Sequence, residues 1–313
     1  MPRRFLCLCA LMAVYFTANT ARAGKYDLDL TPLGRVRSDG TVAQDNEAFR
    51  SLASEVGSLV APRPADSSDS LGLSGFSLSA DIGINTISRR ASYWRDTTSS
   101  PDKVVPTLQV MGRKGLWPGV ELGAGATKVF NSRMWTIAGY GKFALHEGFH
   151  HLPIPSIAVR GMFSRLLGAK DLDLTTLSMD GSVSHVFGLG STFNLTPYLG
   201  YQALFILART GVLDATPGHD EFADGPLPCA NGEAGCVVQP EFVFQSQDAI
   251  VRHRPFFGLR FIYSVIRVNL EAMYTAGGKS GDTSVRTTAG ETESVTDRSG
   301  LQQHYTISFG LDF

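Results

Sequence analysis

Charged side chains recur within segments that are otherwise apolar at every second residue. Acidic and basic members occur in equal number, and Gln202 and His304 share their faces. Opposite charges that are enclosed together pair, and such pairs either stiffen a structure or line a constriction that selects solutes by charge. Both interpretations stay open for this set, which comprises Asp81, Glu121, Lys142, Arg160, Asp180, Arg260, Arg267 and Glu271.

Residues suited to hydrolysis are present, but their arrangement does not favour catalysis. Ser184 and His185 are adjacent, and neighbouring residues on a strand point to opposite faces. The sequence contains no Gly-x-Ser-x-Gly motif. We therefore predict no catalytic residue, and a protease or lipid hydrolase remains the weaker alternative. Its candidates belong to a polar segment whose charges are expected to be solvated: His219, Asp220, Glu221, Asp248 and His253.

Three histidines, His146, His150 and His151, lie close together in a segment that ends at Pro153. Imidazole is a common metal ligand, but this segment is expected to be a turn without helical support for ligands four residues apart. A polar turn is the favoured interpretation. We therefore expect no metal site and no cofactor.

Cys229 and Cys236 flank a short segment that contains two glycines. In an oxidising compartment such a pair is expected to form a disulfide. A pair of metal-binding thiols is the rival interpretation. It usually needs two further soft ligands, and only His219 is near in sequence.

The N-terminus has the pattern of an export signal. Arg3 and Arg4 precede a run of about a dozen apolar residues, and Ala21-Arg22-Ala23 places small residues before a cleavage site. We predict that residues 1–23 are a signal peptide cleaved after Ala23. The remaining chain has 25 basic and 29 acidic residues and so a charge of −4. Its mild acidity gives no sign of a nucleic-acid partner.

Residues 24–75 form a separate N-terminal segment in this interpretation. Asp45 can cap a helix over residues 45–60, in which apolar residues recur at helical spacing. Pro62 and Pro64 end it, and residues 65–75 resemble a linker. One amphipathic helix cannot bury its own apolar face, so we expect it to lie in the periplasm or inside a barrel.

From residue 76 onward, apolar and polar residues alternate with a period of two. We predict an all-β fold, a transmembrane antiparallel barrel over residues 76–313, because segments of about ten residues span a bilayer as tilted strands. Ten strands are expected, or twelve if a further pair lies between residues 209 and 250. The ten segments are 76–88, 103–113, 119–129, 133–146, 154–165, 172–186, 193–209, 252–264, 266–275 and 302–313.

The connections between these segments fall into two classes. If the first strand starts in the periplasm, the two longest connections, 210–251 and 276–301, both lie on the outer side. Aromatic residues near the predicted strand ends suggest two girdles at the membrane interfaces. The outer girdle would contain Tyr93, Trp94, Phe130, Trp135 and Tyr274, and the inner one Trp117, Phe149, Phe187 and Phe313.

The end of the chain carries a more specific signal. Tyr305, Ile307, Phe309, Leu311 and Phe313 alternate with less apolar residues up to the terminal phenylalanine. This ending resembles the C-terminal signature of Gram-negative outer-membrane β-barrel proteins. The resemblance implies a barrel in the outer membrane, surrounded by its lipids, whose last strand is read by the barrel-assembly machinery.

Two functions therefore remain open. An N-terminal helix in the lumen suggests a narrow or gated channel or transporter for small or lipophilic solutes. The alternative is a non-conducting structural or surface-display barrel that interacts through its loops 210–251 and 276–301. The sequence indicates neither the solute nor the oligomeric state.

Overall fold

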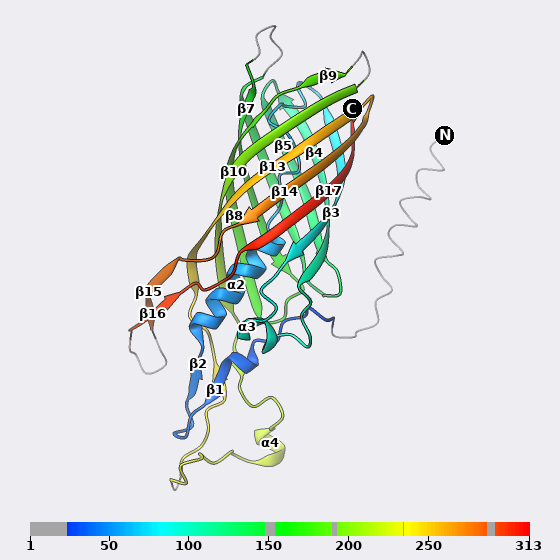
Figure 1. The fold of residues 1–313 in the computed structure, drawn as a ribbon. Coiled ribbons are helices and arrows are strands. Elements are labelled where there is room, and N and C mark those ends of the chain that lie inside the picture. The colour runs from blue at the N-terminus through cyan, green and yellow to red at the C-terminus, as the bar shows by residue number, and fades with distance from the viewer. Residues whose placement is uncertain (1–23, 148–153, 190–192, 234, 287–291) are drawn as a thin grey trace, which may run out of the picture.

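The computed structural model describes residues 24–147, 154–189, 193–233, 235–286 and 292–313. The predicted signal peptide, Phe149, His150 and His151 lie outside the described residues. Ten long strands pair antiparallel with their neighbours. The ring closes because β10 pairs with β13 and β17 pairs with β3 (Figure 1). The strands are β3 (Phe76–Thr86), β4 (Val104–Trp117), β5 (Val120–Val129), β6 (Trp135–His146), β7 (Ser156–Leu167), β8 (Leu172–Ser184), β10 (Phe193–Thr210), β13 (Gln247–Tyr263), β14 (Ile266–Thr275) and β17 (Gln302–Asp312).

This barrel confirms the all-β fold and the count of ten strands. The twelve-strand alternative is wrong, because no strand among the described residues of 211–246 joins the ring. Their two short strands, β11 (Leu213–Asp214) and β12 (Glu241–Phe242), pair only with each other.

The two ends of the barrel differ. The C-terminus and the start of β3 lie together at one end, where Phe76 and Phe313 exchange backbone hydrogen bonds; we call it the turn end. The long connections lie at the opposite end, the loop end, at the bottom of Figure 1. They carry α3 (Ser92–Arg95), α4 (Glu221–Asp224) and the hairpin of β15 (Gly281–Arg286) and β16 (Thr292–Thr296). A further short strand, β9 (Phe187–Leu189), pairs with the start of β10 at the turn end.

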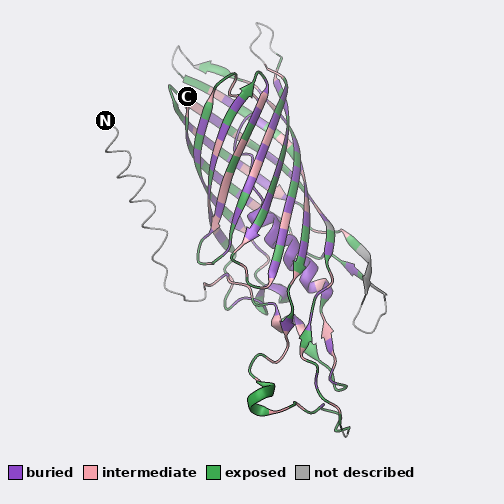
Figure 2. Ribbon diagram, turned by 180° about the vertical axis from the view of Figure 1, so that it is seen from behind, coloured by how far each residue is buried: buried purple, intermediate pink, exposed green. Residues whose placement is uncertain are grey.

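The barrel wall is apolar outside and polar inside. Along β3 exposed and buried residues alternate: Leu78, Ile82 and Ile84 face outward, whereas Ser79 and Asp81 are buried. The same alternation runs around the barrel (Figure 2). A soluble protein rarely exposes so continuous an apolar surface, whereas a membrane-spanning barrel requires one. Among the described residues, no helix is long and apolar enough to cross a membrane.

The N-terminal segment threads this barrel from the loop end to the turn end. It begins with a 3-10 turn, η1 (Thr31–Leu33), and a hairpin of β1 (Gly34–Val36) and β2 (Val42–Gln44). The helix α2 (Asn46–Val60) then enters the lumen, and residues 61–75 continue to the start of β3 (Figure 1). The helix thus lies inside the barrel, one of its two expected places. We call residues 46–75 the plug.

The helix forms where local chemistry favours it. Asp45 Oδ1 accepts a 2.8 Å hydrogen bond from Ala48 N and so caps the first turn. The apolar face of α2 packs into a buried cluster with side chains of β8, β10 and β13, among them Leu174, Leu204 and Ile250. Gly57 brings the two surfaces close, because a Cβ atom there would lie 2.7 Å from the side chain of Ile206. This apolar contact fixes the position of the helix in the loop-end half of the lumen.

The expected girdles are only partly observed. Phe130, Trp135, Trp117, Phe187 and Phe313 are exposed on the outside of the barrel or at its ends. The assignment of Tyr93 and Trp94 to the outer girdle is wrong, because both are buried beside α2. Their polar atoms contact the plug, as described below.

Candidate functional site

The first part of the candidate site is a buried carboxylate on α2. Glu55 is fully buried and accepts four hydrogen bonds from the loop-end connections. Its Oε1 accepts from Tyr93 Oη at 2.9 Å and Gly300 N at 3.0 Å, and its Oε2 accepts from Trp94 Nε1 at 2.7 Å and Ser88 N at 2.9 Å. Burial, followed by the charge of Glu55, raises the pKa of Tyr93. Glu55 therefore joins the plug to the connections on both sides of β3.

On either side of Glu55 along α2, further hydrogen bonds from the wall hold the helix, one of them from an arginine. Ser58 Oγ lies 2.9 Å from Thr275 Oγ1 and 3.2 Å from His304 Nε2. Arg252 Nη1 donates to Ser54 Oγ at 2.7 Å. The polar face of α2 is thereby matched to the wall, while its apolar face lies on β8, β10 and β13.

The second part of the site lies where the plug has left the helical conformation. Asp66 is buried and is surrounded by four cationic side chains of the wall. Its Oδ2 lies 3.2 Å from Arg113 Nη1 and 3.2 Å from Lys142 Nζ. Its Oδ1 lies 3.5 Å from the Nη1 atoms of Arg260 and Arg267. We call these four side chains, which come from β4, β6, β13 and β14, the cation cage.

Neighbouring residues of the plug are held to the wall mainly through their backbone. Arg113 Nη2 donates to Pro64 O at 2.8 Å, and Arg160 Nη1 donates to Asp66 O at 2.7 Å. Asp69 forms an ion pair with Arg260. Backbone groups without a regular partner are satisfied here by wall side chains, so this irregular chain can lie in an enclosed interior.

The eight charged residues singled out from the sequence all have buried side chains that face the lumen. Two pairs form within the wall: Glu121 with Lys142 at 2.9 Å and Arg160 with Asp180 at 2.7 Å. Arg260 and Arg267 instead contact the plug. The other two are hydrogen-bonded acceptors: Asp81 accepts from Gln109, and Glu271 accepts from Ala65 N and Tyr198 Oη.

Sequence reasoning missed the partners that the N-terminal segment supplies. Asp66, Asp69 and Arg63 lie in or next to the stretch interpreted as a linker, where no periodicity marks them as buried. Arg113 was missed at the end of its strand. The available signal was the wall itself, whose inward positions carry more cations than carboxylates.

Charge in the lumen is unevenly divided between wall and plug. Among the described residues of the ten strands, seven buried cations face five carboxylates, a surplus of two positive charges. One further buried carboxylate, Asp297, lies in the connection before β17. The non-helical part of the plug brings Asp66 and Asp69 against Arg63, a net charge of −1. The cations are Arg113, Lys142, Arg160, Arg252, Arg254, Arg260 and Arg267, and the carboxylates are Asp81, Glu121, Asp180, Glu271 and Asp312.

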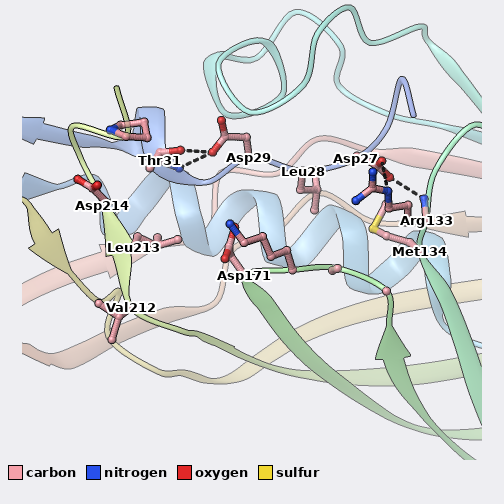
Figure 3. A pocket seen from close by; sticks show the side chains of 14 residues that line it. Asp27, Leu28, Asp29, Thr31, Arg133, Met134, Asp171, Val212, Leu213 and Asp214 are labelled. Atoms are coloured by element: carbon pink, nitrogen blue, oxygen red, sulfur yellow. Dashed lines mark hydrogen bonds and ion pairs between the residues drawn. The ribbon is translucent and has the colours of Figure 1, made fainter. Parts of the chain in front are cut away.

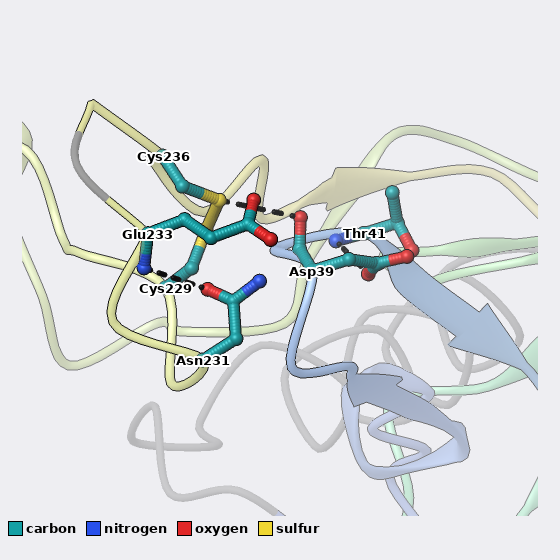
Figure 4. Close-up of a disulfide and its surroundings, with 6 residues drawn as sticks. All are labelled: Asp39, Thr41, Cys229, Asn231, Glu233 and Cys236. Atoms are coloured by element: carbon teal, nitrogen blue, oxygen red, sulfur yellow. Dashed lines mark hydrogen bonds between the residues drawn. A yellow bond between two sulfur atoms is a disulfide. The ribbon is translucent and has the colours of Figure 1, made fainter.

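A cap of loops covers the loop end. Cys229 and Cys236 form the predicted disulfide, with their Cα atoms 5.5 Å apart (Figure 4). The bridge lies against the β1–β2 hairpin: Cys236 Sγ is 3.5 Å from Asp39 O, and Gln239 N donates to Gly40 O at 2.8 Å. The bridged loop thus holds the hairpin that precedes the plug.

A second anchor lies at the start of the described chain. Lys25 Nζ donates to Asp102 Oδ2 at 2.6 Å, and Tyr26 Oη donates to Val104 O at 3.0 Å. The hydrogen bond from Lys25 lowers the pKa of Asp102, and burial raises the pKa of Tyr26. The chain before the plug is therefore held at the rim of the barrel.

An open cleft of about 450 Å³ lies in this cap, lined by residues of the N-terminal segment and of three connections (Figure 3). Its carboxylates mostly accept hydrogen bonds from backbone N–H groups. Asp29 accepts from Thr31 N at 3.0 Å, Asp214 accepts from Thr216 N at 2.7 Å, and Asp27 accepts from Arg133 N at 2.6 Å. The first two contacts form local turns, and the third joins the N-terminal segment to the β5–β6 connection.

The structure separates the residues considered for hydrolysis. His219 Nε2 lies 2.7 Å from Gly225 O within the cap, whereas His253 stacks on Tyr201 on the outer surface of the barrel. Ser184 is buried in the lumen beside the plug. Within the described ranges, no three His, Cys, Asp or Glu side chains are grouped so as to hold a metal ion.

Comparisons with known proteins give remote similarities. No protein-family model and no curated protein matches the sequence. The translocator domain of the autotransporter NalP from Neisseria meningitidis shares 10% identity over 77% of this chain and 88% of that one, with a TM-score of 0.38. The transport unit of the autotransporter AIDA-I from Escherichia coli shares 9% identity over 89% and 100%, with a TM-score of 0.36. The outer membrane protease OmpT from Escherichia coli shares 7% over 77% and 94%, with a TM-score of 0.34.

At these identities and TM-scores the similarities carry no argument about function. The fold follows from the closed ring of ten strands and the apolar outer wall. The chain is a membrane-spanning β-barrel whose lumen is occupied by its own N-terminal segment.

Proposed function

We propose that the protein is an outer-membrane channel for small hydrophilic solutes, closed in this conformation by its plug. The main support is the lumen wall, whose inward side chains between the turn end and α2 are mostly polar or charged. Met111, Met162, Phe256 and Met273 are apolar exceptions. A wall of this kind would hold water if the plug left. The ring of paired strands is closed, which favours hydrophilic solutes over lipophilic ones that would leave sideways into lipid.

The plug is also built as a separate element. Only its helical half is attached by a large apolar contact, whereas residues 61–75 are held by hydrogen bonds and ion pairs. Water and ions can replace such contacts one by one, while an apolar contact must be broken at a cost that scales with its area. The polar half is therefore the part of the plug that can leave and return.

Conductance in planar bilayers tests the proposal. We expect the full chain to give brief openings above a closed baseline and a chain lacking residues 24–75 to stay open. Because the shortened barrel loses part of its core, a second test keeps the full chain. Ser68→Cys with Ser182→Cys places two thiols, one on the polar half of the plug and one on β8, where the hydroxyl oxygens are 3.0 Å apart. Oxidation would then lock the plug and abolish openings.

Reduction should restore the openings in this variant. The wild-type chain treated with the same reductant controls for loss of the native disulfide. The single variant Ser68→Cys controls for the substitution itself. A barrel that conducts in neither the full nor the shortened form would overturn the channel proposal.

The second candidate is a display function, favoured by the composition of the cap. Residues 210–246 contain six carboxylates and no lysine or arginine, and the ring of Phe222 is fully exposed at the tip of α4. Aromatic residues of this kind often anchor protein interfaces. If display is the function, Phe222→Ala should abolish binding of intact cells to their target without changing conductance. Equal binding by cells with the wild-type protein and cells with Phe222→Ala would argue against the display function.

A further inference from the structure

The cation cage around Asp66 is more strongly cationic than one carboxylate requires. Among the described residues, Lys142 has a second acidic partner in Glu121, and Arg267 has one in Asp312 at 3.4 Å. The ion pairs of Arg113 and Arg260 go to the plug alone. Two of the four cations would thus lose their counter-charges if the plug left.

Donors at the cage also exceed acceptors. Within the described chain, several buried guanidinium nitrogens have no hydrogen-bond acceptor: Arg113 Nε, Arg260 Nε, and Arg267 Nε and Nη2. Buried polar atoms normally find a partner, and guanidinium groups match the planar geometry of a carboxylate. The cage therefore offers a carboxylate more donors than Asp66 uses.

Together with the surplus of two positive charges in the wall, these observations identify a ligand class. We infer that the cation cage is a binding site for small carboxylate anions that pass through the lumen, and that Asp66 occupies it as a built-in substitute when the plug is in place. This inference rests on the proposed channel. It assigns the solute class, and it makes solute and plug competitors for the same four side chains.

Chemical rescue tests the site in the full chain, without any need for conductance. Asp66→Ala removes the carboxylate and leaves the cage around a small cavity. The variant is refolded in detergent with formate or acetate, and with chloride at equal ionic strength. We expect it to unfold at a lower urea concentration than wild type in chloride and to recover at least roughly half of this shift in formate.

The control is Asp81→Ala, which removes another buried carboxylate that lies outside the cage. Its unfolding midpoint should be the same in formate and chloride. A midpoint of Asp66→Ala that is equal in all three salts would overturn the inference. Equal midpoints would mean that the cage binds none of these anions or binds them all alike.

Reversal potentials of the open barrel provide the second test. A chain lacking residues 24–75 should pass acetate in preference to potassium by roughly fivefold or more, since Arg113 and Arg260 then lack their counter-charges on the plug and attract anions into a narrow lumen. Arg113→Gln with Arg260→Gln should remove most of this preference. Arg252→Gln, a buried lumen arginine outside the cage, should keep it.

The two proposals fail in different ways. Absence of conductance in every form refutes the channel, while chemical rescue of Asp66→Ala still reports on the site. An open barrel that prefers cations, or that keeps its anion preference without Arg113 and Arg260, refutes the carboxylate site and leaves the channel intact.

Discussion

Replacing Glu55 by glutamine tests whether the loop end is closed by one buried carboxylate. The four donors divide evenly, two on Oε1 and two on Oε2. A glutamine amide presents one acceptor oxygen and one NH2 group. Whichever way the amide is turned, two donors face a donor and lose their acceptor.

The size of the effect follows from this count. A buried donor without an acceptor costs about 1–3 kcal/mol, so two cost about 2–6 kcal/mol. Relaxation of the connections toward water would bring the value to the lower end. The free energy of unfolding, measured by urea titration of the refolded barrel in detergent micelles, should therefore fall by at least ~2 kcal/mol.

Glu47→Gln is the matched control, since it makes the same change on the same helix. Glu47 pairs with Arg298, whose side chain is 74% exposed, and such a pair contributes less than about 1 kcal/mol. Loss of the Glu55 charge should also bring the pKa of Tyr93 down toward its usual value, which absorbance of the phenolate measures. If both variants unfold at the same urea concentration and Tyr93 titrates as before, the role given to Glu55 is refuted.

Three further predictions concern the anchors of the plug. Gly57→Val should push α2 away from β10 and lower the free energy of unfolding by about 1–3 kcal/mol, as overpacking does; no change in a urea titration would contradict this close approach. Because the pKa of Asp102 is lowered, its contact with Lys25 stabilises the fold above the usual carboxyl pKa and is lost as pH falls through the lowered value. Protection of the Tyr26 amide from hydrogen exchange should therefore drop below about pH 4. In Asp102→Asn this protection should be insensitive to acid. Cys229→Ser with Cys236→Ser should make the cap easier to cleave by protease, because the closed loop accounts for about 2–3 kcal/mol in the chain-entropy model, while the barrel itself should resist as before.

The barrel could be predicted because its determinant is local. Each strand alternates outward residues such as Leu78 and Ile82 with inward residues such as Ser79 and Asp81, and a period of two is visible in any ten-residue window. The capped helix was visible for the same reason. The role of Phe313 and its neighbours in assembly stays a prediction, since a folded barrel does not report on its insertion.

The candidate site was harder to predict from the sequence, because the residues in contact there are distant from one another along the chain. Asp66 lies in an irregular stretch, and its four partners come from strands between 47 and 201 residues away. Tyr93 and Trp94 were misplaced because aromatic residues are common both at membrane interfaces and as buried donors.

The lumen is filled in two chemically different ways, and the difference supports the proposed channel. The apolar face of α2 packs against apolar side chains of β8, β10 and β13, a contact that itself desolvates no charge. Around Asp66 the same lumen buries five charged side chains, although apolar residues of similar volume often stabilise an interior as well or better. If filling the lumen were the only requirement, apolar packing could have continued to the turn end. Polar contacts are used instead in the part of the plug that lacks helical structure, where they can be exchanged for contacts with water and solute. A pathway through the lumen needs such exchangeable contacts there.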